Sequence, residues 1–218
     1  MADTPNILLI SSDQQHWSTI GAIHPELDTP NLDRLCREGT RFNRAYCPNP
    51  TCTPTRASII TGKYPSQHGA YSLGTKLSET EPTVGEDLQA AGYRTALVGK
   101  AHFQPTRSTE AFPSLESHPL LRDLDYWRGF HGPFYGFEHV ELARNHADEH
   151  LVGQHYAIWM EENGLADWED YFGMPDGSRL GQKHTWSIPE EYHYGTWIAA
   201  RSCALIDQYK ESDEPFFL

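Results

Sequence analysis

The sequence has no apolar run that approaches the roughly 18 residues a membrane-spanning helix needs. It is also poor in basic residues, because 17 Lys and Arg stand against 30 Asp and Glu, which gives a formal charge of −13. Nucleic acids and membrane surfaces both recruit positively charged faces, so this balance argues against both as partners. A small anionic ligand stays compatible with it, since a metal ion, a lysine and an arginine can hold an anion locally.

Cysteine is scarce as well. The four cysteines are Cys36, Cys47, Cys52 and Cys203. They form no Cys-x-x-Cys pair and no histidine lies at zinc-finger spacing from them, which argues against a structural zinc site. The N-terminus lacks a basic stretch and a cleavage signal, so a cytoplasmic location is expected unless an export signal precedes it. In that setting a disulfide between Cys47 and Cys52 is the less favoured alternative.

The apolar runs predict an α/β fold. Residues 6–15 (NILLISSDQQ) and 94–103 (RTALVGKAHF) are apolar stretches that end in polar residues, as buried parallel strands do. Residues 40–47 predict a short strand between them. Helices are predicted at 28–39, 55–63, 83–93, 150–164 and 189–210. The alternation predicts a doubly wound, mostly parallel sheet flanked by helices, with ligands at the carboxyl ends of the strands.

Three parts are expected within 1–218. Residues 1–105 form the α/β core, 106–187 an irregular insertion rich in aromatic residues and histidine, and 188–218 a helix followed by the start of a core strand. The final PFFL resembles the beginning of a central strand, which normally runs several residues further. The chain is therefore expected to be truncated at its C-terminus and to be the N-terminal portion of a longer catalytic domain.

Polar side chains follow both apolar runs. Asp13 and Gln14 offer oxygen ligands to a hard cation such as Ca²⁺ or Mg²⁺, and an Asx-turn cap is the competing explanation. Lys100 and His102 lie two residues apart, so strand alternation predicts that they share a face. Together they can supply a fixed charge and a movable proton to an anion, unless they only begin a solvated loop.

Cys52 and Arg56 lie at the start of a predicted helix, on either side of Pro54. A helix N-terminus and a guanidinium attract anions, and the same field favours a thiolate nucleophile at Cys52. The alternative is a buried free cysteine. The convergence of a metal ligand, a cysteine, an arginine, a lysine and a histidine on one sheet edge predicts an active site.

The segment CTPTRASIITGK, which starts at Cys52, resembles the signature of the type I sulfatases. In that signature a Cys or Ser is followed by x-P-x-R and, after a helical turn, by T-G-[KR]. The resemblance extends through PNILLISSDQ, TPNLDRLCREGTRFNRAYCPNPTC, YPSQHG and AGYRTALVGKAH, thins through the insertion, and returns in PEEYHYGTWIAARSCALID and EPFFL. It implies an alkaline-phosphatase-like α/β fold and metal-dependent hydrolysis of a sulfate ester.

The resemblance also implies how Cys52 acts. A formylglycine-generating enzyme oxidises this cysteine before folding, in a stretch that includes Thr53, Pro54 and Arg56. The hydrated aldehyde is a geminal diol: one hydroxyl attacks sulfur and releases the alcohol, and deprotonation of the other expels sulfate and restores the aldehyde. Arg56 is implied to hold the formylglycine. His68, in YPSQHG, is expected to be structural.

By position, the resemblance makes Asp13, Gln14 and Cys52 ligands of one divalent cation, Ca²⁺ first, with Mg²⁺ or Mn²⁺ as alternatives. Lys100 and His102 match the pair that contacts the sulfate and the diol. The family supplies further metal ligands, a second lysine and a second histidine from its C-terminal half. Residues 1–218 alone are therefore expected to be inactive without that part.

Substrate choice stays open within this resemblance. A small sulfated substrate is expected, with specificity shaped by residues 126–155, and a homo-oligomer is left open. Gln14 stands where the family usually has an acid, a variant shared with phosphonate monoester and phosphodiester hydrolases, whereas GKAH favours sulfate esters. The alternatives are such a hydrolase on the same scaffold, a non-catalytic sulfate-ester-binding relative with unmodified Cys52, and a thiol hydrolase.

Overall fold

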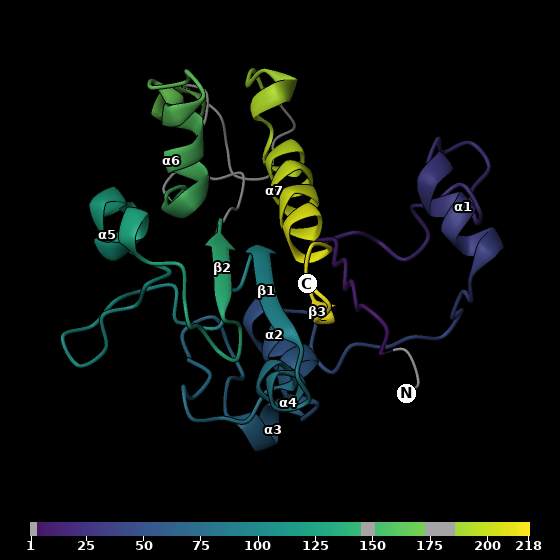
Figure 1. Cartoon of the computed structure of the whole chain (residues 1–218), viewed down its shortest axis with the longest axis horizontal. Coiled ribbons are helices and arrows are strands. Elements are labelled where there is room, and N and C mark those ends of the chain that lie inside the picture. Colours follow the sequence, from purple (N-terminus) through teal and green to yellow (C-terminus); the bar gives the residue numbers. More distant parts are fainter. Residues whose placement is uncertain (1–3, 145–150, 173–185) are drawn as a thin grey trace. The chain divides into compact units, whose positions relative to one another are not determined.

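The computed structural model describes residues 4–144, 151–172 and 186–218 (Figure 1). The chain forms two compact units, Met1–Leu8 with Pro48–Leu218, and Leu9–Cys47. Across the described ranges, no helix has the length and apolar character needed to cross a membrane. The elements in chain order are α1 (Pro30–Glu38), α2 (Cys52–Thr61), α3 (Pro65–His68), α4 (Val84–Ala90), β1 (Arg94–Gly99), η1 (Leu120–Arg122), α5 (Leu124–Gly129), β2 (His139–Leu142), α6 (Gln154–Glu162), η3 (Trp168–Tyr171), η4 (Glu190–Tyr192), α7 (Tyr194–Tyr209) and β3 (Phe216–Phe217).

The larger unit contains a parallel three-stranded sheet in the order β2-β1-β3 (Figure 1). β1 pairs with β2 over residues 96–99 and with β3 over residues 94–95. Parallel strands require long connections, and here the connections carry the helices. The strand predicted at 94–103 is confirmed over residues 94–99, and the strand predicted at the end of the chain is confirmed, with β1 between its two neighbours.

Helices cover both faces of this sheet, because side chains alternate along β1. Ala96 is fully buried and packs in a cluster with Leu205 of α7. Leu97 points the other way, toward a cluster that contains Ala57 of α2 and Phe217 of β3. Burying one aliphatic or aromatic side chain contributes roughly 1.5–3 kcal/mol, so the two clusters hold the helices to the sheet. The predicted α/β fold with flanking helices is confirmed.

Local chemistry fixes both ends of α2. The side chain of Asn49 accepts a hydrogen bond from the Thr51 N–H at 2.8 Å, and its carbonyl accepts one from the Thr55 hydroxyl. At the other end Gly62 adopts φ 67, and its N–H donates to the carbonyl of Ser58. A left-handed residue at this place is typical of glycine. The predicted helix and its glycine stop are confirmed.

α4 begins with a reciprocal cap. Thr83 Oγ1 accepts from the Glu86 N–H at 3.4 Å, and the Glu86 carboxylate accepts from the Thr83 N–H at 3.0 Å. This capping box satisfies two N–H groups that the helix itself leaves without partners. Gly92 follows with φ 88. The predicted N-cap at Thr83 is confirmed.

The strand predicted at 6–15 is wrong for this structure. Within that run only Ile7 is paired: its N–H donates to Phe216 O at 2.8 Å, and its carbonyl accepts from Leu218 N–H at 3.0 Å. Residues 8–10 are 49%, 53% and 80% exposed. A strand needs a neighbouring strand that pairs with it along its length, and an apolar composition does not supply one.

The predicted insertion contains a strand of the core sheet. β2 lies inside 106–187, where the sequence shows little periodicity, and its four residues alternate polar and apolar too briefly to be recognised. α6 confirms the helix predicted at 150–164, although its first predicted residue is not described. Residues 145–150 and 173–185, also part of the predicted insertion, lie outside the described residues.

Two further boundaries differ from expectation. Residues 40–47 contain bends in place of the short strand predicted there. α7 begins at Tyr194, although the helix was predicted from Pro189, because a 3-10 turn comes first and the His193 side chain then accepts from the Gly195 N–H. A side-chain cap of this kind sets a helix start more strongly than a proline nearby.

Candidate functional site

Three of the predicted site residues meet at the carboxyl end of β1. Lys100 directly follows β1, and Cys52 is the first residue of α2. The Lys100 ammonium donates to Cys52 Sγ at 3.5 Å, and Arg56 Nη1 donates to the Lys100 carbonyl at 2.6 Å. All three side chains are half-buried. A ligand could therefore reach them from solvent while their positions are held by the surrounding protein.

Positive charge converges on Cys52. The Lys100 ammonium lies beside its sulfur, and Arg56, one turn along α2, holds the backbone from which Lys100 projects. α2 has ten residues, and the N-terminus of such a helix carries a partial positive charge. A lysine, an arginine and a helix N-terminus together favour a compact oxyanion. The arrangement is chemically suited to a nucleophile attacking a tetrahedral anion.

His102 reaches this region by a backbone that has left the strand. Gly99 has φ 105 and His102 has φ 58, both in the left-handed region. Strand alternation ends at Gly99, so it does not determine whether Lys100 and His102 share a face. His102 is fully buried, whereas Lys100 is half-buried. The structure thus gives the two residues different environments within one short segment.

A buried carboxylate that the sequence analysis did not identify holds this segment. Glu116 is 1% exposed, and its two oxygens accept hydrogen bonds from the N–H groups of His102 at 2.5 Å and Gln104 at 2.7 Å. Burial raises the pKa of Glu116, while the two N–H groups and the charge of Arg144 oppose that rise. A single glutamate in an irregular stretch carries no sequence signal for this role.

Asp13 and Gln14 belong to the other unit, Leu9–Cys47. Both side chains are exposed, and Gln14 has φ 55. Within the part of the chain that the structure describes, no group of three or more His, Cys, Asp or Glu side chains is arranged to hold a metal ion. The metal-ligand role assigned to Asp13, Gln14 and Cys52 therefore stays a prediction.

His68 contributes to the support of α2. It is 5% exposed; its Nε2 lies 3.0 Å from Ser58 Oγ, and its Nδ1 accepts from the Ala70 N–H at 3.1 Å. Desolvation by burial lowers the pKa of His68, which favours the neutral ring that these two contacts use. These contacts join α2 to the segment after α3, as expected for a structural histidine.

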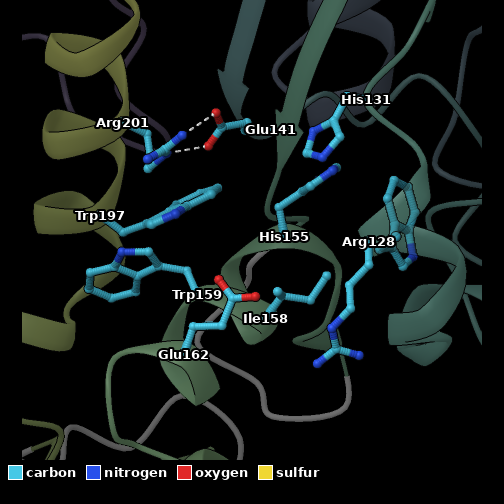
Figure 2. A pocket seen from close by; sticks show the side chains of 10 residues that line it. Arg128, His131, Glu141, His155, Ile158, Trp159, Glu162, Trp197 and Arg201 are labelled. Carbon is cyan, nitrogen blue, oxygen red and sulfur yellow. Dashed lines mark hydrogen bonds and ion pairs between the residues drawn. The ribbon is translucent and has the colours of Figure 1, made fainter.

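A separate pocket of about 340 Å³ lies among α5, β2, α6 and α7 (Figure 2). On one side Arg201 makes two hydrogen bonds to Glu141, Nε to Oε2 at 2.6 Å and Nη2 to Oε1 at 2.9 Å. Burial alone would raise the pKa of Glu141, but bonds from His139 and Arg201 lower it to about 2. The residues that line the pocket are Trp127, Arg128, His131, Glu141, His155, Ile158, Trp159, Glu162, Trp197 and Arg201.

His155 forms another wall of this pocket and is held in one tautomer. Its Nδ1 accepts from the Leu142 N–H at 2.9 Å, and its Nε2 lies 2.8 Å from the Phe130 carbonyl, to which it donates. Burial lowers the pKa of His155 to about 4. The neutral imidazole thus links the end of β2 to the start of α6 and serves the packing of this region.

Comparison with known proteins places this geometry in context. A family model described as Sulfatase matches residues 5–218. The chain is 31% identical over 215 residues to "Uncharacterized sulfatase YidJ" of Escherichia coli, a match that covers 98% of this chain and 37% of that protein. It is 37% identical over 223 residues to an arylsulfatase of Clostridium perfringens, covering 98% of this chain and 42% of that protein.

A solved structure supports the fold. The phosphonate monoester hydrolase of Agrobacterium radiobacter superposes with a TM-score of 0.70 at 23% identity, over 98% of this chain and 40% of that one. Identity at that level supports a shared fold and carries no statement about the reaction. The chain spans about two fifths of the length of each of these three proteins.

Proposed function

The chain belongs to the sulfatase family, and we propose that it supplies the nucleophile and an anion-binding part of a sulfate ester hydrolase. The observation that carries the proposal is the 3.5 Å contact between the Lys100 ammonium and Cys52 Sγ at the N-terminus of α2. A nucleophile beside fixed positive charge is what attack on an anionic ester requires, because the transition state concentrates charge on oxygen.

Each side chain of the site has its own chemical role in this proposal. Cys52, converted to formylglycine, supplies the nucleophile, and its sulfur here stands in for an oxygen of the modified side chain. Lys100 stabilises negative charge on the sulfate, and Arg56 fixes Lys100 through its carbonyl while adding charge of the same sign. His102 carries the proton that the leaving alcohol or the diol needs. The partner in maturation would be a formylglycine-generating enzyme.

One divalent cation belongs to the proposal. Asp13 and Gln14 would hold it together with the modified Cys52, since carboxylate, amide and hydroxyl oxygens are the donors that a hard cation such as Ca²⁺ prefers. The exposed side chains of Asp13 and Gln14 fit this donor set. When bound, the ion would supply electrostatic stabilisation of developing negative charge. A single carboxylate leaves a dication under-compensated, so further ligands from other residues complete the proposal.

Substrate choice is assigned in this proposal to residues 126–155. This stretch contributes Trp127, His131, Glu141 and His155 to the walls of the pocket in Figure 2. The substrate is proposed to be a small sulfated molecule. A phosphonate monoester or phosphodiester hydrolase is the second candidate, favoured by Gln14, which stands where the family usually has an acid.

Rates on two aryl esters test the proposal. A full-length protein that contains this chain is expected to hydrolyse an aryl sulfate faster than the matching aryl phosphonate monoester. Cys52→Ala is expected to lower turnover by more than about a thousandfold, because the nucleophile is lost. Circular dichroism of the variant should match that of the unsubstituted protein. A preference for the phosphonate would favour the second candidate, and undiminished turnover by Cys52→Ala would contradict the mechanism.

A further inference from the structure

The segment that carries Lys100 and His102 is held in an unfavourable backbone conformation. Gly99 tolerates its φ of 105, but His102, at φ 58, has a side chain that disfavours this region. A residue other than glycine is strained in this sparsely populated region, so neighbouring groups must hold it there.

Glu116 provides that restraint. Its carboxylate spans the turn: Oε1 accepts from the His102 N–H at 2.5 Å and Oε2 accepts from the Gln104 N–H at 2.7 Å. In the opposite direction, the side-chain oxygen of Gln104 accepts a hydrogen bond from the Leu115 N–H at 2.7 Å. Because one carboxyl group accepts from both N–H groups, it fixes their directions relative to each other. Residues 102–104 and residues 115–116 therefore hold each other in place through hydrogen bonds in both directions.

A second layer of buried polar groups fixes Glu116 itself. Arg144 is 1% exposed, and its Nη1 donates to the Glu116 main-chain carbonyl at 2.7 Å. The Arg144 N–H in turn donates to the side chain of Gln154 at 2.7 Å, and Gln154 is fully buried at the start of α6. Hydrogen bonds between buried polar groups are electrostatically stronger than in water, so these contacts restrain the Glu116 main chain. Residues that follow β2 thereby support residues that follow β1.

We propose that Glu116 is a positioning residue for the sulfate-binding pair Lys100 and His102. By fixing the N–H groups of His102 and Gln104, its carboxylate sets the path of the chain from Lys100 onward, and so the distance between the Lys100 ammonium and Cys52. The role rests on the proposed function. Glu116 touches the reacting groups only through the backbone, so its effect should appear in turnover more than in substrate binding.

The test compares Glu116→Gln with Glu81→Gln in the full-length protein. Glu81 is the control because its partly buried carboxylate is also paired, with the Lys63 ammonium, and it lines neither the Cys52 cluster nor the pocket of Figure 2. Glutamine at 116 keeps one acceptor and turns an amide N–H₂ toward the other backbone N–H. We expect kcat for an aryl sulfate to fall roughly ten- to a hundredfold, since small misplacements have effects of that size.

The KM should stay within about threefold for Glu116→Gln, and Glu81→Gln should leave kcat within the same factor. The limb of the pH–rate profile that disappears in His102→Asn should shift in Glu116→Gln and stay in place in Glu81→Gln. Equal losses of kcat in the two glutamine variants, or an unmoved limb, would overturn the proposal. If Glu116→Gln does not fold, Glu116→Asp shortens the side chain that bridges the two N–H groups, and its kcat should fall below that of Glu81→Gln; an equal kcat would overturn the proposal.

Amide hydrogen exchange separates this proposal from the proposed function. Exchange at His102 and Gln104 should quicken in Glu116→Gln, with no change there in Glu81→Gln. If the protein hydrolyses no sulfate ester yet these two amides lose protection, the sulfatase function fails and the restraint by Glu116 stands. If sulfate turnover is present and the amides keep their protection, the positioning role is overturned and the function stands.

Discussion

Residues 94–104 and residues 6–14 have the same pattern, an apolar run followed by polar side chains, yet they have different neighbours. β1 has β2 on one side and β3 on the other, and Ala96 is fully buried. In the other run Ile7 alone pairs with the sheet, and residues 8–10 are half-exposed to exposed. Apolar character predicts which segments can enter a sheet, whereas the pairing of N–H and C=O groups decides which do.

The polar residues after the two runs differ in the same way. Lys100 contacts Cys52 and is held by Arg56, so three of the predicted residues form a cluster in the structure. Asp13 lies in the unit Leu9–Cys47, and its place in the site depends on the family resemblance alone. The part of the proposed site around Lys100 is thus supported by contacts in the structure, and the part around Asp13 by the family resemblance.

The largest expected effect is on catalytic activity, and it distinguishes the role of Lys100 from that of Asp13. In the full-length protein, Lys100→Ala should lower kcat by about a hundred- to a thousandfold, as loss of one charge-stabilising donor does. Asp13→Ala should cause a loss of similar size, but added Ca²⁺ should restore part of it, because mass action offsets a weakened metal site. Steady-state rates at increasing Ca²⁺ concentration measure both.

The recovery of activity on addition of Ca²⁺ distinguishes the two variants. No recovery is expected for Lys100→Ala at any Ca²⁺ concentration, since its charge does not depend on the ion. Unchanged activity of Asp13→Ala at low Ca²⁺ would show that Asp13 is not a ligand and that the two segments do not serve one site.

A smaller effect tests the packing difference. Leu142, paired opposite Gly99, is 1% exposed, whereas Leu8 is 49% exposed. In the 218-residue chain Leu142→Ala should destabilise by about 3 kcal/mol, the usual cost of a buried leucine truncation. Leu8→Ala is the matched control and should cost less than about 1 kcal/mol. Urea denaturation measures both free energies of unfolding, and equal losses would show that the first run is buried as well.

Much of the fold follows from local pattern. β1 and α4 were predicted because alternation of elements, a capping threonine and a following glycine act over short distances. The meeting of Cys52 with Lys100, 48 residues apart, is consistent with the rule that parallel strands gather their ligands at one edge. The sequence is therefore sufficient to predict that these residues meet.

What sequence missed depends on contacts between distant segments. β2 is only four residues long, and its identity as a strand comes from pairing with β1. Glu116 has no local pattern, because its partners are backbone N–H groups fourteen and twelve positions away. The run at 6–10 failed for the opposite reason: its local pattern is strong, but only Ile7 is paired. In all three cases the hydrogen-bonding partners, and not the local sequence propensity, decide the structure.

The central claim is that Cys52 is the precursor of the nucleophile. It is tested most directly by the mass of the Cys52-containing peptide from catalytically active full-length protein. The account predicts the aldehyde, which is lighter than the thiol form because sulfur and two hydrogens are exchanged for one oxygen, together with aryl sulfate turnover that scales with the aldehyde fraction. Full activity from a preparation in which Cys52 is an unmodified thiol would contradict it.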